Sequence, residues 1–318
     1  MHKRQLGNTD IHITPLGLGA WAMGGGGWSF GWGPQDDEES IKTINRSLDL
    51  GINWIDTAAV YGLGHSEEVV GKAIKDRAEK PYIFTKCSLV WNDKREVGNS
   101  LKADSIRREA EASLKRLDID AIDLYQIHWP SPEADIEEGW ETMAQLKKEG
   151  KVRAIGVSNF NIEQMQRIQR IAPIDSLQPP YSLVHPEVEK EILPYCEHYN
   201  IGVIVYSPMA SGLLTGRMTK ERVERMPADD WRKRDAEFQE PRLSRNLELA
   251  KLLNEIGYLH NLPAGAVAIA WALRNPVVTG AIVGSRHPAQ IEELIMAAEY
   301  RPDELELEQI DKFLQDHP

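Results

Sequence analysis

Four polar side chains of the kinds used in proton transfer interrupt apolar runs in the first half of the chain: Asp56, Tyr61, Lys86 and His128. A tyrosine phenol titrates near pH 10, too high for easy proton transfer at neutral pH. A neighbouring ammonium lowers that pKa, and a carboxylate can fix the ammonium in place. A histidine beside the phenol can orient a carbonyl oxygen or relay a proton. Together, the four side chains would form a proton donor for a carbonyl group under reduction. The hydride must then come from a nicotinamide cofactor.

These residues need elements that bring them together, and the chain alternates short β-branched runs with helical patterns. The eight predicted strands are Pro15–Ala20, Asn53–Thr57, Tyr82–Lys86, Ile122–His128, Val152–Ser158, Asp175–Gln178, Gly202–Ser207 and Gly280–Gly284. Predicted helices include Glu38–Leu50, Asp104–Leu117, Ile136–Lys148, Leu247–Ile256 and Pro288–Ala298. This alternation predicts an α/β fold, a (β/α)8 TIM barrel, with a doubly wound open sheet as the alternative. In a barrel, chemistry lies at the C-terminal ends of the strands, where Asp56, Lys86 and His128 would meet.

Two further segments bear on the architecture. A β-hairpin, Lys3–Leu6 paired with Ile11–Thr14, precedes the first barrel strand and could close the bottom of the barrel. The mixed-charge segment Arg217–Arg242 follows the seventh strand, as either a solvated loop or a lid over the ligand. Because no linker rich in Gly, Ser or Pro divides the chain, we expect a single domain over residues 1–318, with extra loops at the C-terminal mouth.

Composition narrows the class of protein. The 318 residues are 42% hydrophobic and 27% charged, which suits a globular protein. A net charge of −12 argues against nucleic-acid binding, and no apolar run approaches the roughly 18–20 residues of a membrane span. Two cysteines, Cys87 and Cys196, and no visible secretory signal favour the cytoplasm. We expect a monomer or weak oligomer that acts on a small molecule, and no metal-binding motif stands out.

Two familiar patterns lack the flanking structure that their chemistry needs. Gly17-Leu-Gly19-Ala-Trp-Ala22 resembles a dinucleotide fingerprint, but the glycine run after it disfavours the helix that must follow. Gly27-Trp-Ser29-Phe-Gly31 resembles a hydrolase nucleophile elbow, yet neither a strand nor a helix flanks it.

Five ordered motifs resemble those of the aldo-keto reductase superfamily, and they cover essentially the whole chain. They are Asp56-Thr-Ala-Ala-Val-Tyr61-Gly62, Phe84-Thr-Lys86, Asp123-Leu-Tyr-Gln-Ile-His128, Gly156-Val-Ser-Asn-Phe160 and Ile282-Val-Gly-Ser-Arg286. The long opening loop looks closest to bacterial reductases of the general-stress and inositol-operon type. The resemblance implies that Asp56, Tyr61, Lys86 and His128 are catalytic.

The resemblance also implies a cofactor, NADP(H), and the residues that hold it. Ser158, Asn159 and Gln178 would bind the nicotinamide carboxamide, Tyr206 would stack on the ring, and Arg286 with Ser285 would bind the adenosine 2′-phosphate. The remaining cofactor residues implied are Ala20, Trp21, Asp56, Ser207, Pro208, Ser211, Gly212, Leu213, Gly216, Gly284, Gln290 and Glu293. Many relatives have asparagine where this chain has Leu294, and leucine cannot hydrogen-bond adenine.

The substrate is less well defined by the sequence. Trp28, Trp32, Trp91 and Trp129 are candidates for an apolar substrate pocket or for packing at the mouth. Aldehydes, ketones, sugars and quinones all remain open as substrates. The main hypothesis is an NADPH-dependent carbonyl reductase. The alternatives are an NADP(H)-binding redox sensor or partner subunit, and a barrel aldolase or isomerase that uses Lys86 as a Schiff-base nucleophile.

Overall fold

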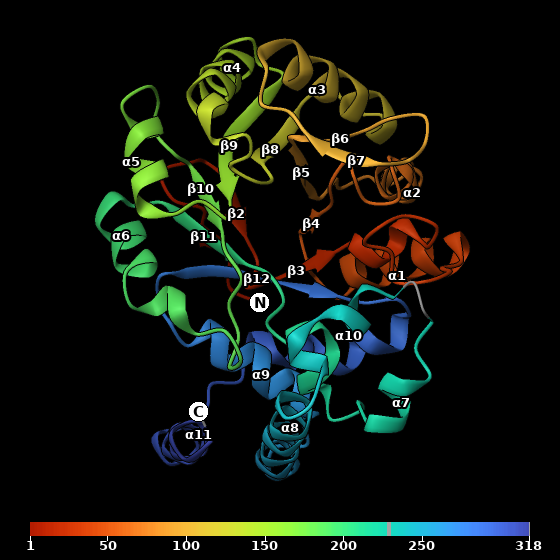
Figure 1. Cartoon of the computed structure of the whole chain (residues 1–318), viewed down its shortest axis with the longest axis vertical. Helices are drawn as coiled ribbons and strands as arrows, with labels where there is room; N and C mark the ends of the chain where they lie inside the picture. The colour runs from red at the N-terminus through yellow and green to blue at the C-terminus, as the bar shows by residue number, and fades with distance from the viewer. Residues whose placement is uncertain (228–229, 318) are drawn as a thin grey trace.

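The computed structural model describes residues 1–227 and 230–317, and its centre is a closed barrel of eight parallel strands (Figure 1). In chain order the barrel strands are β3 Leu16–Gly19, β4 Trp54–Asp56, β5 Tyr82–Cys87, β8 Ile122–Ile127, β9 Val152–Ser158, β10 Ser176–Gln178, β11 Gly202–Val205 and β12 Val278–Gly284. The barrel closes because β12 pairs with β3, as in Ala281 opposite Leu16. The predicted (β/α)8 barrel is confirmed, and the open sheet is excluded.

Helices surround the strands in Figure 1, and the structure has more of them than the five predicted ranges. They are α1 Asp37–Asp49, α2 His65–Ile74, α3 Ala103–Leu117, α4 Ile136–Lys148, α5 Ile162–Gln169, α6 Ile192–Tyr199, α7 Lys220–Glu224, α8 Arg242–Leu259, α9 Ala264–Leu273, α10 Pro288–Leu294 and α11 Glu304–Asp316. In the described part of the chain, the three helices α7, α8 and α9 lie between β11 and β12. Helix α9 escaped sequence analysis because every one of its residues is buried, so it has no polar face to reveal a helical period.

Two helix predictions needed the largest adjustment at their ends. The predicted helix Leu247–Ile256 is the middle of the longer α8. The predicted helix Pro288–Ala298 divides into α10 and a 3-10 turn, Ile295–Ala298. Such shifts arise because periodicity marks the middle of a helix better than its terminal turns.

The N-terminal hairpin closes the bottom of the barrel, as predicted. Its strands, β1 Arg4–Gln5 and β2 His12–Ile13, pair antiparallel. Beside them, Leu6, Ile11 and Ile13 are buried in one cluster with the barrel residues Trp54 and Phe84. The bottom is therefore sealed by apolar packing, which leaves the C-terminal mouth as the open end.

The pattern Gly17-x-Gly19 has a packing role in the barrel. Both glycines lie inside β3, and a Cβ atom at Gly17 would lie only 2.2 Å from the Trp54 ring. The ring needs that space, and its indole nitrogen donates a hydrogen bond of 2.9 Å to the carbonyl of Thr14. The glycine pattern is thus explained without a dinucleotide-binding turn.

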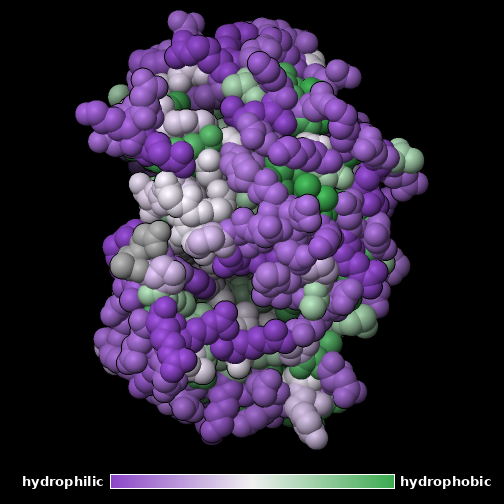
Figure 2. Space-filling view, turned by 90° about the vertical axis from the view of Figure 1, so that its right-hand side faces the viewer, coloured by the Kyte–Doolittle hydropathy of each residue, from purple (hydrophilic) through white to green (hydrophobic). Residues whose placement is uncertain are grey.

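Hydrophilic residues cover most of the face shown in Figure 2, with hydrophobic side chains in small separate patches. Among residues 1–227 and 230–317, no single helix has the length and apolar composition to cross a membrane. Only α8 and α9 together pass that test, and they are bent by 92°. The same described residues contain no group of three or more His, Cys, Asp or Glu side chains placed to hold a metal ion.

Candidate active site

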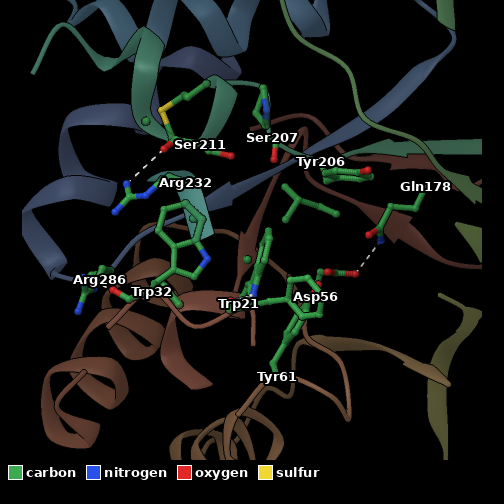
Figure 3. Close-up of a pocket in the computed structure, with 18 of the residues that line it drawn as sticks. Trp21, Trp32, Asp56, Tyr61, Gln178, Tyr206, Ser207, Ser211, Arg232 and Arg286 are labelled. Carbon is green, nitrogen blue, oxygen red and sulfur yellow. Dashed lines mark hydrogen bonds between the residues drawn. The ribbon is translucent and has the colours of Figure 1, made fainter. Parts of the chain in front are cut away.

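A cleft with a volume of about 770 Å³ lies at the C-terminal mouth of the barrel. Three of the four predicted catalytic residues line it: Asp56 at the end of β4, Tyr61 in the following loop, and His128 directly after β8. Lys86, near the end of β5, lies beneath the surface of the cleft and is 1% exposed. The barrel therefore brings all four residues to one end, and Figure 3 shows part of the cleft.

Asp56 is the centre of a buried polar cluster. One carboxylate oxygen accepts a hydrogen bond of 2.5 Å from the Lys86 ammonium, which also donates to the carbonyl of Thr57 at 2.9 Å. The other oxygen accepts from the side-chain amides of Gln178 at 2.8 Å and Gln126 at 3.4 Å. Burial lowers the pKa of Lys86, and the charge of Asp56 opposes that shift. A buried carboxylate with this many donors holds the ammonium in one place.

Tyr61 packs against this cluster and is 8% exposed. Its ring stacks on Trp21 at a centroid distance of 5.8 Å, and the Lys86 ammonium lies 5.2 Å from its centroid. Burial raises the pKa of the Tyr61 phenol well above its usual value, and the charges of Asp56 and Tyr206 add to that shift. Desolvation of the phenolate thus sets the direction of the net shift, which is upward.

His128 lies on the other side of the phenol. Its ring meets the Tyr61 ring edge-on, with centroids 5.8 Å apart. Burial and the nearby Lys86 charge lower the pKa of His128 well below its usual value. The imidazole is therefore neutral near pH 7, and it can both donate and accept a hydrogen bond at the cleft wall.

The three predicted carboxamide-binding residues form one hydrogen-bonded group at the ends of β9 and β10. The Ser158 hydroxyl donates to the carbonyl of Gln178 at 2.8 Å. The Asn159 amide donates to the carbonyl of His128 at 3.0 Å, and its oxygen accepts from the Tyr206 hydroxyl at 2.9 Å. These contacts orient polar side chains along the wall of the cleft.

The segment after β11 has an unusual backbone. Ser207, Ala210, Ser211 and Gly212 all have positive φ values, of 55°, 46°, 54° and 99°. Only the glycine adopts this region without steric cost, so the others store strain. The N–H groups of Ala210 and Gly212 donate within the segment, to the carbonyls of Ser207 and Met209 at 2.9 and 3.1 Å. The hydroxyls of Ser207 and Ser211 are donors that an anion can use. Because Ser207, Ser211 and Gly212 line the cleft, the segment can serve as a cradle for a phosphate group.

Arg286, the predicted phosphate ligand, follows β12 and lines the cleft, but its guanidinium points to the loop before α1. It donates to the side-chain oxygen of Gln35 at 2.6 Å, to the carbonyl of Trp32 at 3.3 Å and to the carbonyl of Pro34. Its backbone N–H donates to the Gln290 side chain at 2.7 Å. The predicted phosphate ligand is thus held by groups of the protein itself.

The other predicted adenosine contacts differ in accessibility. Ser285 is 2% exposed, and its hydroxyl donates to the carbonyl of His287 at 2.9 Å. Glu293 lines the cleft and forms an ion pair with Arg217 at 2.5 Å. Leu294 also lines the cleft and presents an apolar surface there.

The segment Arg217–Arg242 packs partly across the cleft, although its residues 228–229 lie outside those that the structure describes. Trp231 stacks on Trp21 with centroids 5.4 Å apart. The Arg234 guanidinium donates to the carbonyl of Ser29 at 3.2 Å. These contacts favour the lid interpretation over the solvated loop, because side chains of the segment join two walls of the cleft.

Arg232 is a cleft residue that sequence analysis did not name. It pairs with Asp230 at 2.6 Å, and its guanidinium lies 4.4 Å from the centroid of the Trp32 ring. It also donates to the carbonyl of Ser211 at 3.4 Å, as the dashed line in Figure 3 marks. The only sequence signal for this residue was the mixed charge of its segment.

The four tryptophans predicted to contact substrate have different positions. Trp28, Trp32 and Trp129 line the cleft, together with the exposed ring of Phe30. Trp91 ends the short strand β6 Leu89–Trp91, which pairs with β7 Val97–Asn99, and it is not among the lining residues. The hairpin instead contributes other side chains to the cleft.

The predicted cofactor residues divide into two groups. Those that line the cleft are Trp21, Asp56, Ser158, Asn159, Gln178, Tyr206, Ser207, Pro208, Ser211, Gly212, Gly284, Arg286, Gln290 and Glu293. Those outside the lining are Ala20, Leu213, Gly216 and Ser285. Lining residues that the sequence analysis did not name include Phe30, Leu89, Val97, Asn99, Ser131, Met218, Arg222 and Arg232. Most of these residues are of apolar or commonly exposed types, and only the folded chain shows that they line the cleft.

Comparison with known proteins identifies the family. Residues 15–315 match the aldo/keto reductase family. The chain belongs to this family. Aldo-keto reductase YhdN of Bacillus subtilis (strain 168) is 41% identical over 92% of this chain and 88% of its own length. An NADH-specific methylglyoxal reductase of Escherichia coli (strain K12) is 35% identical over 93% of both chains.

The solved structures agree with this assignment. The glycerol dehydrogenase AKR11B4 from Gluconobacter oxydans superimposes with a TM-score of 0.89 at 36% identity, covering 99% of this chain and 95% of the other. The aldo/keto reductase barrel and its mouth are therefore shared. The names of these relatives state NADH specificity in one case and different small substrates. The cofactor and the substrate of this chain therefore need separate arguments.

In this aldo/keto reductase, Glu109 of α3 supports the backbone next to Lys86, the predicted catalytic lysine. It accepts a hydrogen bond of 2.9 Å from the N–H of Ser88, which has a φ of 83°. The Ser88 hydroxyl in turn accepts from the N–H of Trp129 at 3.3 Å. Glu109 thus helps to hold the end of β5 against the loop after His128.

Burial raises the pKa of Glu109 to about 7 in the folded protein, against the ordinary 4.5. A raised pKa gives stability that is complete below about pH 4.5 and is lost as the pH rises through about 7. Relative to wild type, Glu109→Gln should therefore be more stable at pH 8 than at pH 5.5. Thermal unfolding across this range measures the difference, with the exposed Glu308→Gln as the control. A difference between wild type and Glu109→Gln that does not vary with pH would contradict the assignment.

Proposed function

We propose that this aldo/keto reductase reduces aldehyde or ketone carbonyls to alcohols with NADP(H), reversibly, and that Tyr61 is the general acid and base. The observation that carries the proposal is the position of Tyr61 in the cleft, in contact with His128 and above the Lys86–Asp56 pair. Burial keeps the Tyr61 phenol protonated at neutral pH, which is the state a proton donor needs.

The other three catalytic residues position and balance this donor. Asp56 holds the Lys86 ammonium close to the phenol ring. As Tyr61 gives up its proton, the ammonium stabilises the negative charge that grows on the phenol oxygen. The neutral His128 can hydrogen-bond the substrate oxygen and fix its direction. In the oxidation of an alcohol, the same groups take the proton back.

The cleft has the features needed to hold a dinucleotide. The left-handed turns of Ser207, Ser211 and Gly212 form a cradle suited to a pyrophosphate, and Ser158, Asn159 and Gln178 present amide and hydroxyl groups to a carboxamide. We propose these residues, with Tyr206, Arg286 and Gln290, as the cofactor site. When bound there, the nicotinamide supplies the hydride that the protein's own side chains cannot provide.

The structure also bears on the alternative functions. A Schiff-base nucleophile must reach the substrate, but Lys86 is 1% exposed and is occupied by Asp56 and Thr57. This disfavours the aldolase hypothesis. The sensor or subunit hypothesis predicts cofactor binding with little turnover.

Turnover with both cofactors tests the proposal. The loss of NADPH or NADH absorbance should be followed with small aliphatic aldehydes, aromatic aldehydes and ketones, and with Tyr61→Phe as the inactive control. Steady turnover that Tyr61→Phe abolishes supports the reductase. Tight cofactor binding without turnover on any carbonyl would support the sensor instead.

Cofactor choice gives a separate prediction. Arg286→Ala should weaken NADPH binding by about ten- to 150-fold, because a charge-assisted hydrogen bond is worth about 1.5–3 kcal/mol. NADH binding should change far less, since NADH lacks the 2′-phosphate. Raised salt should weaken the binding of NADPH to wild type more than to the variant. Isothermal titration with both cofactors measures this, and equal losses would show that Arg286 only supports the loop before α1.

A further inference from the structure

Arg286 is a partly buried cation that has only neutral acceptors among the described residues. Its guanidinium donates to the side chain of Gln35 and to the carbonyls of Trp32 and Pro34. None of the ion pairs formed by residues 1–227 and 230–317 includes Arg286, because the neighbouring carboxylate, Asp230, pairs with another arginine. An anion would be a stronger partner for this guanidinium than an amide or a carbonyl.

Gln35 holds the arginine from both sides. Its oxygen accepts from the guanidinium at 2.6 Å, while its amide nitrogen donates to the backbone carbonyl of Arg286 at 3.1 Å. The amide nitrogen also donates to the Ser40 hydroxyl at 3.1 Å, which fixes the side chain on α1. We call these contacts, from Gln35, Trp32 and Pro34 to Arg286, the arginine latch.

The arginine latch connects to the wall of the substrate side. The Trp32 ring meets Trp21 edge-on at a centroid distance of 5.5 Å, and Trp21 stacks on Tyr61. In Figure 3, Trp32 lies between Arg286 and Trp21, on the path towards Tyr61. Any movement of the loop that carries Trp32 therefore changes the aromatic wall beside the reacting tyrosine.

We propose that the arginine latch competes with the cofactor's 2′-phosphate for Arg286, so that Gln35 sets the preference for NADPH and the cofactor sets the position of Trp32. The inference rests on the proposed function, because it takes Arg286 as the phosphate ligand. Three of the five N–H donors of the Arg286 guanidinium, including that of Nε, point to acceptors on the loop. A phosphate that takes the same donors must displace these acceptors. With NADH, the latch stays closed and Trp32 keeps the position described here. With NADPH, Arg286 leaves the latch, and Trp32 gains freedom.

Two substitutions of Gln35 act in opposite directions. Gln35→Met keeps the length of the side chain and removes its acceptor, so Arg286 becomes easier to recruit and NADPH should bind about two- to tenfold more tightly. Gln35→Glu gives Arg286 an ionic partner, so NADPH should bind about tenfold or more weakly. NADH affinity should change less than about twofold in both variants. The control is Gln166→Met, which changes an exposed residue of α5 that has no part in the cleft.

Direct titration of the protein with each cofactor gives the deciding readout, without turnover. The latch is supported if the two Gln35 variants shift the affinity for NADPH in opposite directions and leave the affinity for NADH unchanged. Parallel shifts for both cofactors overturn it, because they indicate a merely structural role of Gln35. The latch is also overturned if Gln35→Glu weakens NADPH binding while Gln35→Met leaves it unchanged. Long-range repulsion between the new carboxylate and the phosphate explains that pattern. If wild type binds and oxidises NADPH, and both Gln35 variants bind NADPH with the affinity of wild type, the latch is overturned but the proposed function is not. Wild type that does not bind NADPH overturns the proposed function.

Substrate selectivity tests the link to Trp32. In wild type, the ratio of kcat/KM for a bulky aromatic aldehyde to that for a small aliphatic aldehyde should differ between NADPH and NADH. In Gln35→Met, the ratios with the two cofactors should converge, because the latch is weakened in both cases. Equal ratios with both cofactors in wild type would overturn the link between the latch and the substrate pocket.

Discussion

Tyr61→Phe should lower kcat at least 100-fold while the affinity for NADPH barely changes. The substitution removes only the phenol hydroxyl, and general acid–base catalysis contributes about 10²–10⁴-fold. The ring stays between Trp21 and His128, so the packing of the cleft is preserved. Burial makes this loss severe, because water has little access to replace the missing proton donor.

The measurement compares single-turnover rates and cofactor affinity of the variant with those of wild type. Tyr199→Phe serves as the matched control, since Tyr199 is 46% exposed on the outside of the barrel and should leave both quantities unchanged. If Tyr61→Phe retained more than about a tenth of the wild-type kcat, another group would have to be the proton donor.

Lys86→Met should cause the second large loss, approaching that of Tyr61→Phe. Methionine keeps the length of the side chain but removes the charge that stabilises the developing phenolate. Because Lys86 and Tyr61 act as a unit, the losses should not add in the double variant. Pre-steady-state reduction rates of the two single variants and the double variant measure this. Fully additive losses would show that Lys86 acts independently of Tyr61.

The same substitution also tests the energetics of the buried pair. Without Lys86, the Asp56 carboxylate keeps only the amide donors Gln178 and Gln126. Breaking a buried ion pair by removing one partner costs about 3–5 kcal/mol. Thermal unfolding must therefore accompany the kinetics. The double variant Lys86→Met/Asp56→Asn should recover part of the lost stability, because it removes the unpaired charge.

Several elements were predictable from the sequence for identifiable reasons. Buried parallel strands such as Gly202–Val205 read as continuous apolar runs, and their alternation with helices specifies the barrel. Polar residues near the ends of such strands stand out from their surroundings, which is why Asp56 and Lys86 were recognisable. Gln126 carried the same signal inside an apolar strand and was missed, although it contacts Asp56.

Other properties depended on contacts between residues far apart in the chain. Arg286 follows the last strand as predicted, yet its partners Gln35 and Trp32 lie about 250 positions earlier. Trp231 reaches Trp21 only because the segment after β11 folds back over the mouth. No local pattern of spacing or composition predicts such pairs.

The amino-acid sequence by itself thus determined the order of strands and helices and the types of residue at the barrel mouth, because periodicity and strand ends are local properties. The tertiary structure decided the protonation of Tyr61 and the orientation of Arg286. Both depend on burial and on the distances between groups from separate elements. Desolvation raises the pKa of the phenol although Lys86 is near, and three acceptors on the loop before α1 hold the guanidinium against that loop.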